Sequence, residues 1–127
     1  MEELHKRYRD LLGTVPPTLH ERQQLAAAAH FPEALQAIEQ FREILLHHNP
    51  LPRHTQQLVH LALLIGAREE YPALLHARAA VRAGATAREL FGLCATAAVT
   101  GGMPSFTLAV HVVTQALQLG GDAGEKQ

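Results

Sequence analysis

Nine histidines and one cysteine are the side chains of this 127-residue sequence whose chemistry operates near neutral pH. An imidazole titrates close to neutrality, so a histidine can serve as a general acid, a general base or a metal ligand. Cys94 lies among Leu93, Ala95 and Ala97, which is typical of a small buried hydrophobe. A single cysteine excludes a disulfide within the chain and suits a reducing compartment.

His76 stands out because small residues surround it on its helical face. They leave room either for a ligand beside the imidazole or for the close approach of another helix. The spacing alone leaves both interpretations open. These neighbours are Pro72, Ala73, Ala79, Ala80 and Ala83.

A three-histidine metal site is an alternative use of His60, His76 and His111, because three imidazoles on zinc leave one open position. However, the three residues are scattered over separate predicted helices and none belongs to a local ligand motif such as HExxH. Histidines with that distribution are more typical of surface or core positions. We therefore predict no metal and no cofactor.

Proline and glycine punctuate the chain at intervals that suit helices of ordinary length, and nothing favours strands. We predict an all-α fold of about six to seven helices in a single domain, 1–127, with an N-terminal helical arm over 1–17 and a frayed tail over 121–127. The expected helices run from Glu2 to Leu12, Thr18 to Ala29, Pro32 to Leu45, Pro52 to Ile65, Glu69 to Ala83, Thr86 to Thr100, and onward from Pro104.

Charge and hydropathy restrict the classes of partner. Lys and Arg number 11 against 12 Asp and Glu, so no basic field is available to neutralise phosphates, and nucleic-acid binding is not expected. The N-terminus carries alternating charges without an apolar signal region, and no apolar run approaches the roughly 20 residues of a membrane span. We expect a cytoplasmic protein with no membrane association.

The segment REEYPALLHARAAVRAGATAREL, from Arg68 to Leu90, resembles the core motif of the carboxymuconolactone decarboxylase and alkylhydroperoxidase D family. There a helix that carries a functional histidine leads into an A-x-x-A-G-A-T turn and a second helix. The strings FPEALQAIEQF, LPRHTQQLVHLAL and GGMPSFTLAVHVV lie at the family's usual distances. The resemblance implies an alkylhydroperoxidase D-like (AhpD-like) helical bundle with the fourth and fifth helices as a central antiparallel hairpin.

The peroxidase branch of this family uses a Cys-x-x-Cys-x-x-x-His motif and an upstream glutamate. His76 matches the histidine, but Glu69 and Pro72 occupy the cysteine positions and Gln57 the glutamate position. Since the thiolate is the nucleophile in that chemistry, the match predicts that direct peroxidase activity is lost.

The decarboxylase branch also lacks the cysteines and uses the histidine for proton transfer on a lactone acid. The resemblance therefore implies a lyase-like decarboxylase of a small organic acid, with His76 as general acid/base. Gln57 and Glu70 are the further catalytic candidates, and His60 and Tyr71 the substrate-binding ones. Gln57 and His60 are three apart on one helix and share a face, which the family fold would turn towards His76. Alternatively, these two side chains satisfy each other without a substrate.

Two further functions stay open. One is a non-catalytic oligomeric binding protein that keeps a polar pocket, and the other is residual alkylhydroperoxidase or peroxiredoxin-type activity through Cys94. The resemblance also implies assembly into a homotrimer or hexamer. The sequence decides neither the substrate nor the number of subunits.

Overall fold

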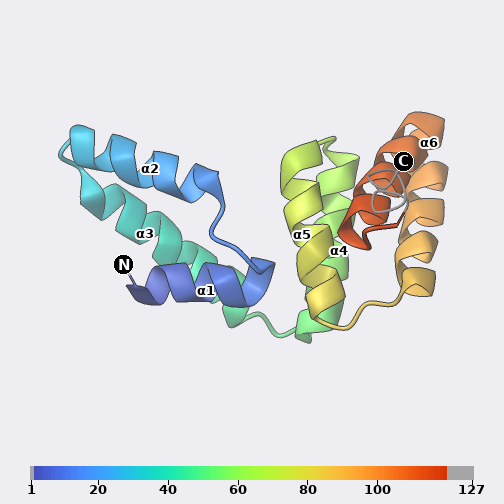
Figure 1. The fold of residues 1–127 in the computed structure, drawn as a ribbon, viewed down its shortest axis with the longest axis horizontal. Helices are drawn as coiled ribbons and strands as arrows, with labels where there is room; N and C mark the ends of the chain where they lie inside the picture. The colour runs from blue at the N-terminus through green and yellow to red at the C-terminus, as the bar shows by residue number, and fades with distance from the viewer. Residues whose placement is uncertain (1, 120–127) are drawn as a thin grey trace. The chain divides into compact units, whose positions relative to one another are not determined.

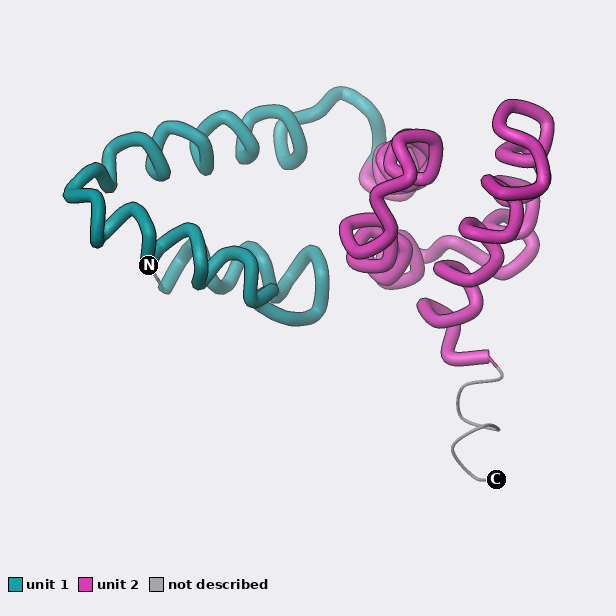
Figure 2. Tube along the Cα trace, turned by 90° about the horizontal axis from the view of Figure 1, so that it is seen from above, with its two compact units in different colours: residues 1–52 teal, residues 53–127 magenta. Residues whose placement is uncertain are grey.

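The computed structural model describes residues 2–119, which form helices and short connections with no strand among them. The predicted all-α fold is confirmed. The chain divides into two compact units, residues 1–52 and residues 53–127, coloured separately in Figure 2. The single domain over 1–127 and its arm over 1–17 stay predictions, and the tail predicted over 121–127 lies outside the described residues.

Unit 1 contains α1 (Glu2–Leu12), α2 (Pro17–Ala28) and α3 (Pro32–Arg42), followed by a π-helical turn, η1 (Glu43–His47) (Figure 1). Pro17 and Pro32 begin their helices, where the missing amide hydrogen costs nothing. The third helix was expected to stay α-helical to Leu45, but it widens at Glu43. Asn49 ends this segment by donating a side-chain hydrogen bond of 2.9 Å to the carbonyl of Leu45.

The buried side chains of α1 follow the stripe that the sequence predicts. Tyr8, Leu11 and Leu12 are buried, and on α2 Leu19 is fully buried. Leu35 and Leu46 are half-buried, and most other large apolar side chains from α2 to η1 are exposed, so this unit buries little of its own apolar surface. The exposed side chains are Leu25, Phe31, Ile38, Phe41, Ile44 and Leu45.

Unit 2 contains α4 (Arg53–Gly66), α5 (Glu70–Arg82) and α6 (Ala87–Ala116). Figure 1 shows α4 and α5 side by side as the predicted hairpin, with α6 packed against them. On α5 the side chains of Ala73, Ala77 and Ala80 are fully buried. Their small size lets the backbones of neighbouring helices approach closely. Larger side chains from α4 and α6 complete the core, among them Leu61, Ile65, Leu90, Val112 and Val113.

All three helices of unit 2 end with the same hydrogen-bond pattern, including α6, where Gln118 takes the left-handed position at φ 60°. After α5, Ala85 N donates to Ala80 O and Gly84 N to Val81 O, a Schellman motif that places Gly84 at φ 102°. Gly84 was predicted at this position. The pattern recurs after α4, but there the left-handed position is occupied by Arg68, at φ 62°. A side chain at such a φ is strained, whereas a glycine is not.

A capping box begins α6 as predicted. Glu89 N donates to Thr86 Oγ1 at 3.0 Å, and Thr86 N donates to Glu89 Oε1 at 2.9 Å. The hydrogen bond from the Thr86 backbone lowers the pKa of Glu89. The same carboxylate oxygen lies 3.0 Å from His54 Nε2. The first turns of α4 and α6 are therefore connected through one side chain.

The long helix α6 is interrupted at Gly102, which has a φ of 77° and a ψ of −169°. The sequence predicted two helices separated here, and Figure 1 shows the chain changing direction within α6. Gly101 has its own constraint, because a Cβ there would overlap the side chain of Ser105. By length and composition α6 is the one helix among residues 2–119 that could cross a membrane. The break at Gly102 divides this helix into two segments that are each shorter than the roughly 20 residues of a straight span.

Replacing Arg68 tests the strain at the end of α4. We expect the Arg68→Gly variant to be more stable than the Arg68→Ala variant by about 1 kcal/mol, because both lose the side chain and only glycine accepts the positive φ without cost. Denaturant unfolding of the two variants measures this difference. Equal stabilities would contradict the assignment of strain to this residue.

Candidate functional site

The predicted catalytic histidine, His76, lies in the middle of α5 and is 5% exposed. Its Nδ1 is 2.9 Å from Oε1 of Gln57, which is fully buried on α4. Gln57 in turn donates a hydrogen bond from Nε2 to Oε1 of Gln56, at 2.6 Å. Because the amide nitrogen of Gln57 is used as a donor, its oxygen accepts from His76, and Nδ1 of the histidine carries hydrogen. The lone pair of the neutral ring is then on Nε2.

His60 lies three residues after Gln57 on α4 and stacks on His76. The ring centroids are 3.8 Å apart and the ring planes are inclined by 39°. Unlike His76, His60 is partly exposed. The structure therefore brings His76, Gln57 and His60 together, as expected from the family resemblance. The catalytic and binding roles of the three stay predictions.

The alanine face of α5 explains why these polar groups are buried. Ala73, Ala79 and Ala80, one turn before and after His76, are buried, and Ala73 and Ala80 belong to the apolar core of unit 2. The sequence left open whether the small residues around His76 make room for a ligand or for another helix. On this side of the imidazole they are part of the packed core. A buried amide and imidazole must be hydrogen-bonded, and the chain from Gln56 through Gln57 to His76 meets that requirement.

Glu70, the third catalytic candidate, lies in the first turn of α5. Its Oε2 is 3.5 Å from Nε2 of His111 on α6, and both side chains are more than half exposed. These two residues contribute to a surface groove of about 550 Å³ with Arg68 and Thr107, while Met103, Pro104 and Leu108 supply its apolar lining. A carboxylate near the N-terminus of a helix also stabilises the helix, so a catalytic role is not needed to explain Glu70.

Tyr71 is exposed at the surface of α5, and its substrate-binding role stays a prediction. The alternative of a three-histidine metal site needs His60, His76 and His111 together. His60 and His76 contact each other, but His111 contacts Glu70, so this alternative receives no support. Over residues 2–119, no three His, Cys, Asp or Glu side chains are grouped so that they could hold a metal ion.

Cys94 is 1% exposed within the core of unit 2, as its apolar neighbours in the sequence suggested. Burial raises the pKa of this thiol. A raised pKa lowers the thiolate fraction at any given pH, and the thiolate is the reactive form. Both observations oppose residual peroxidase chemistry through Cys94.

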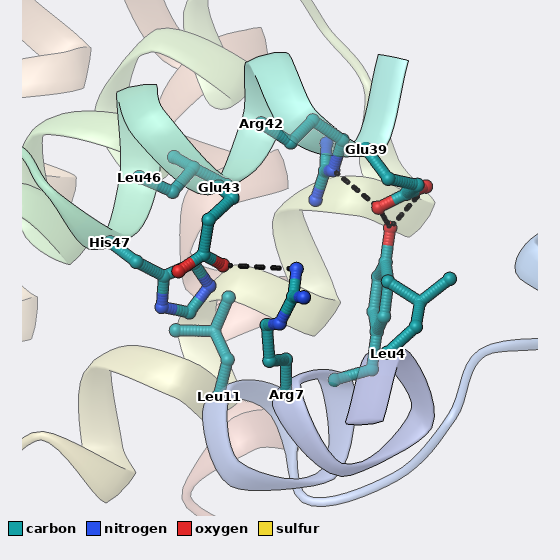
Figure 3. A pocket seen from close by; sticks show the side chains of 9 residues that line it. Leu4, Arg7, Leu11, Glu39, Arg42, Glu43, Leu46 and His47 are labelled. Carbon is teal, nitrogen blue, oxygen red and sulfur yellow. Dashed lines mark hydrogen bonds and ion pairs between the residues drawn. The ribbon is translucent and has the colours of Figure 1, made fainter. Parts of the chain in front are cut away.

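A second polar cluster, in unit 1, was not predicted from the sequence. Tyr8 donates its hydroxyl to the carboxylate of Glu39, with both oxygens at 3.0 Å, and Arg7 Nη1 lies 3.2 Å from Glu43 Oε1 (Figure 3). Arg42 extends the cluster, with Nε 3.9 Å from Glu39 Oε1. Burial raises the pKa of Tyr8, opposed by Arg42 and supported by Glu39. The two arginines of this cluster balance the charges of its two carboxylates. The cluster therefore links α1 to the α3–η1 segment without a net charge.

Gln56 is the residue of the His76 group that sequence reasoning missed. It is 6% exposed and accepts the hydrogen bond that fixes the orientation of the Gln57 amide. The available signal was the pair Gln56-Gln57 directly before the largely apolar segment from Leu58 to Ile65. Two adjacent amides there predict either a surface edge or a buried hydrogen-bonded pair.

Comparison with known proteins gives one match. The sequence model described as the carboxymuconolactone decarboxylase family matches residues 32–115, more than half of the chain, including α3 to most of α6. No curated protein and no solved structure matches the chain.

Gln57→Leu tests the hydrogen-bond chain. We expect a loss of about 1–3 kcal/mol in the free energy of unfolding, because His76 and Gln56 both lose a buried partner. The nitrogen chemical shifts of the His76 ring should also show a smaller preference for hydrogen on Nδ1. Gln115→Leu, at an exposed position of α6, is the control and should change stability by less than about 0.5 kcal/mol. A neutral effect of Gln57→Leu would contradict the proposed chain.

Alkylation of Cys94 by iodoacetamide tests its burial and its raised pKa. We expect the native protein to react at least about 100-fold more slowly than the unfolded chain at the same pH, because the thiol is enclosed and weakly ionised. Cys94→Ser provides the background rate and should leave any peroxide consumption unchanged. Similar rates in the native and unfolded states would contradict the burial of Cys94 and favour residual peroxidase activity through this thiol.

Proposed function

Because the chain belongs to the carboxymuconolactone decarboxylase family, we propose that it is a lyase-like enzyme that decarboxylates a small organic acid, with His76 as general acid/base. The observation that carries the proposal is the 2.9 Å contact between His76 Nδ1 and Gln57 Oε1. It favours the tautomer whose Nε2 lone pair can take a proton, and a general base must present an unprotonated nitrogen to take up a proton.

A lactone acid or a β-keto acid suits this chemistry because its carboxylate can leave as carbon dioxide. The carbon–carbon bond breaks, and its electron pair is delocalised into the adjacent unsaturated carbonyl system to give an enolate. Protonated His76 then donates the proton on Nε2 to carbon, and water supplies the next proton to the ring. The net reaction consumes one proton and releases one molecule of carbon dioxide, without an oxidant or a reductant.

Gln57 is a positioning group in this mechanism. Its amide accepts a hydrogen bond from His76 but takes up no proton, so it orients the ring without adding negative charge. A carboxylate at the same position would stabilise the imidazolium more strongly. The glutamine therefore favours a histidine that both accepts and releases its proton readily.

The substrate is proposed to approach from the side of His60. The alanine side of His76 is occupied by packed core, whereas His60 is partly exposed and touches the His76 ring. His60 would contact a bound acid, with Tyr71 as a further binding residue. We assign Glu70 a weaker catalytic role, because its ion pair with His111 is exposed.

Loss of the peroxidase activity is part of this proposal. Glu69 and Pro72 occupy the positions of the two cysteines, and Cys94 is enclosed in the core. Neither a carboxylate nor a proline can replace a thiolate nucleophile.

A second candidate function is a non-catalytic, homo-oligomeric binding protein. The observation in its favour is the number of large apolar side chains that unit 2 leaves exposed, since contiguous apolar surface is typical of association sites. A homotrimer or hexamer would cover them, and such assembly is equally compatible with the enzyme. The exposed residues are Val59, Leu63, Tyr71, Phe91, Val99, Met103 and Leu119.

His76→Ala separates the two candidates. We expect carbon dioxide release from the responsive lactone or keto acid to fall by about 100-fold or more, the usual contribution of a general acid/base. His20→Ala, an exposed histidine on α2, is the matched control and should retain full activity. Both variants are compared by thermal unfolding and by molar mass in solution.

Undiminished carbon dioxide release by His76→Ala would contradict the catalytic assignment. If a panel of small acids binds without turnover, and binding is unchanged in His76→Ala, the binding protein becomes the better description of the chain.

A further inference from the structure

The stacking of His60 on His76 places two titratable rings in contact. Their centroids are 3.8 Å apart, His76 is 5% exposed and His60 is partly buried. Either ring alone could bind a proton in the neutral range. At this separation the protonation of one ring must affect the other.

Two imidazolium charges in contact repel each other, and the repulsion is poorly screened where water is excluded. A neutral ring stacked on a protonated ring has no such penalty. The doubly protonated state is therefore reached only at lower pH than for two independent histidines. The two groups should titrate in two macroscopic steps that belong to the pair.

The titratable and amide groups on the three packed helices around the pair are neutral, paired or exposed. Gln56 and Gln57 are neutral amides, and Cys94, the buried titratable group on α6, has a raised pKa. His54 on α4 is held by Glu89, and Glu70 by His111. The other titratable side chains of the three packed helices are exposed, namely Arg53 on α4, Tyr71, Arg78 and Arg82 on α5, and Arg88 on α6.

We propose that His60 and His76 form a coupled imidazole pair that carries at most one positive charge near neutral pH. His60 is then a positioning residue that sets the pH range over which His76 accepts a proton. The effect on catalysis depends on the proposed function, whereas the coupling itself follows from the contact between the rings.

Histidine ring signals of the full chain, followed by NMR over the acid and neutral range, measure the coupling directly. In His60→Gln we expect the titration midpoint of His76 to rise by about one pH unit or more, because the neighbouring charge is gone. In His76→Gln the midpoint of His60 should rise by a similar amount only if the two rings have similar intrinsic affinities for a proton, because the ring that binds a proton first does so while its partner is neutral.

His54→Gln is the matched control, since it removes a histidine from the same helix that is paired with Glu89. It should leave the midpoints of both stacked rings in place. His60→Phe keeps an aromatic ring against His76 and serves if the glutamine variant does not fold. With His60→Phe, the two-step titration of the parent should become a single step.

A rise in the midpoint of at least one ring when the other is replaced would establish the pair. Unchanged midpoints in both glutamine variants would overturn it, even if carbon dioxide release depends on His76. Conversely, such a rise in a protein that releases no carbon dioxide would leave the pair established and overturn the proposed function alone. If the function holds, the alkaline limb of the kcat/KM profile should move to higher pH in His60→Gln, in step with the NMR midpoint, because protonated His76 is the proton donor.

Discussion

The close approach of α4 and α5 through the alanine face of α5 is the constraint on which unit 2 depends. Ala73 and Ala80, on the same face of α5 as His76, are fully buried and contribute only methyl groups, and Gln57 of α4 lies within hydrogen-bonding distance of His76. Larger residues at these positions would push the helices apart and leave the amide and the imidazole buried without each other. The packing of the core and the geometry of the candidate site therefore have one cause.

Most of the fold could be predicted because local residue preferences determine where its helices begin and end. The prolines at helix starts, Gly84 after α5, the Thr86 capping box and the break at Gly102 each follow from backbone preferences of the residue concerned. The left-handed Arg68 could not be predicted, since arginine has no such preference and the hydrogen bonds at the end of α4 impose it. The π-helical turn at Glu43 is likewise not encoded in any residue preference that we can identify.

The candidate site was predictable to the extent that it depends on family resemblance. Gln57, His60 and His76 were expected together, and they are in contact. The stacking of the two rings depends on the distance between α4 and α5, which periodicity does not specify. The contact between Tyr8 and Glu39 was missed because a glutamate on α3 is expected to face solvent. Only the structure shows that Tyr8 is its buried hydrogen-bond partner. Roles for Glu70 and Tyr71 depend on a bound substrate and stay predictions.

The alanine face also has a consequence for conformational entropy. Alanine has no side-chain rotamers to lose, so ordering this part of the core costs almost nothing beyond the backbone. The same residues contribute few dispersion contacts, because a methyl group touches few atoms. On α5, ordering this face therefore costs little side-chain entropy, and the dispersion contacts of the core come mainly from larger side chains of α4 and α6, such as Leu61, Ile65 and Leu90.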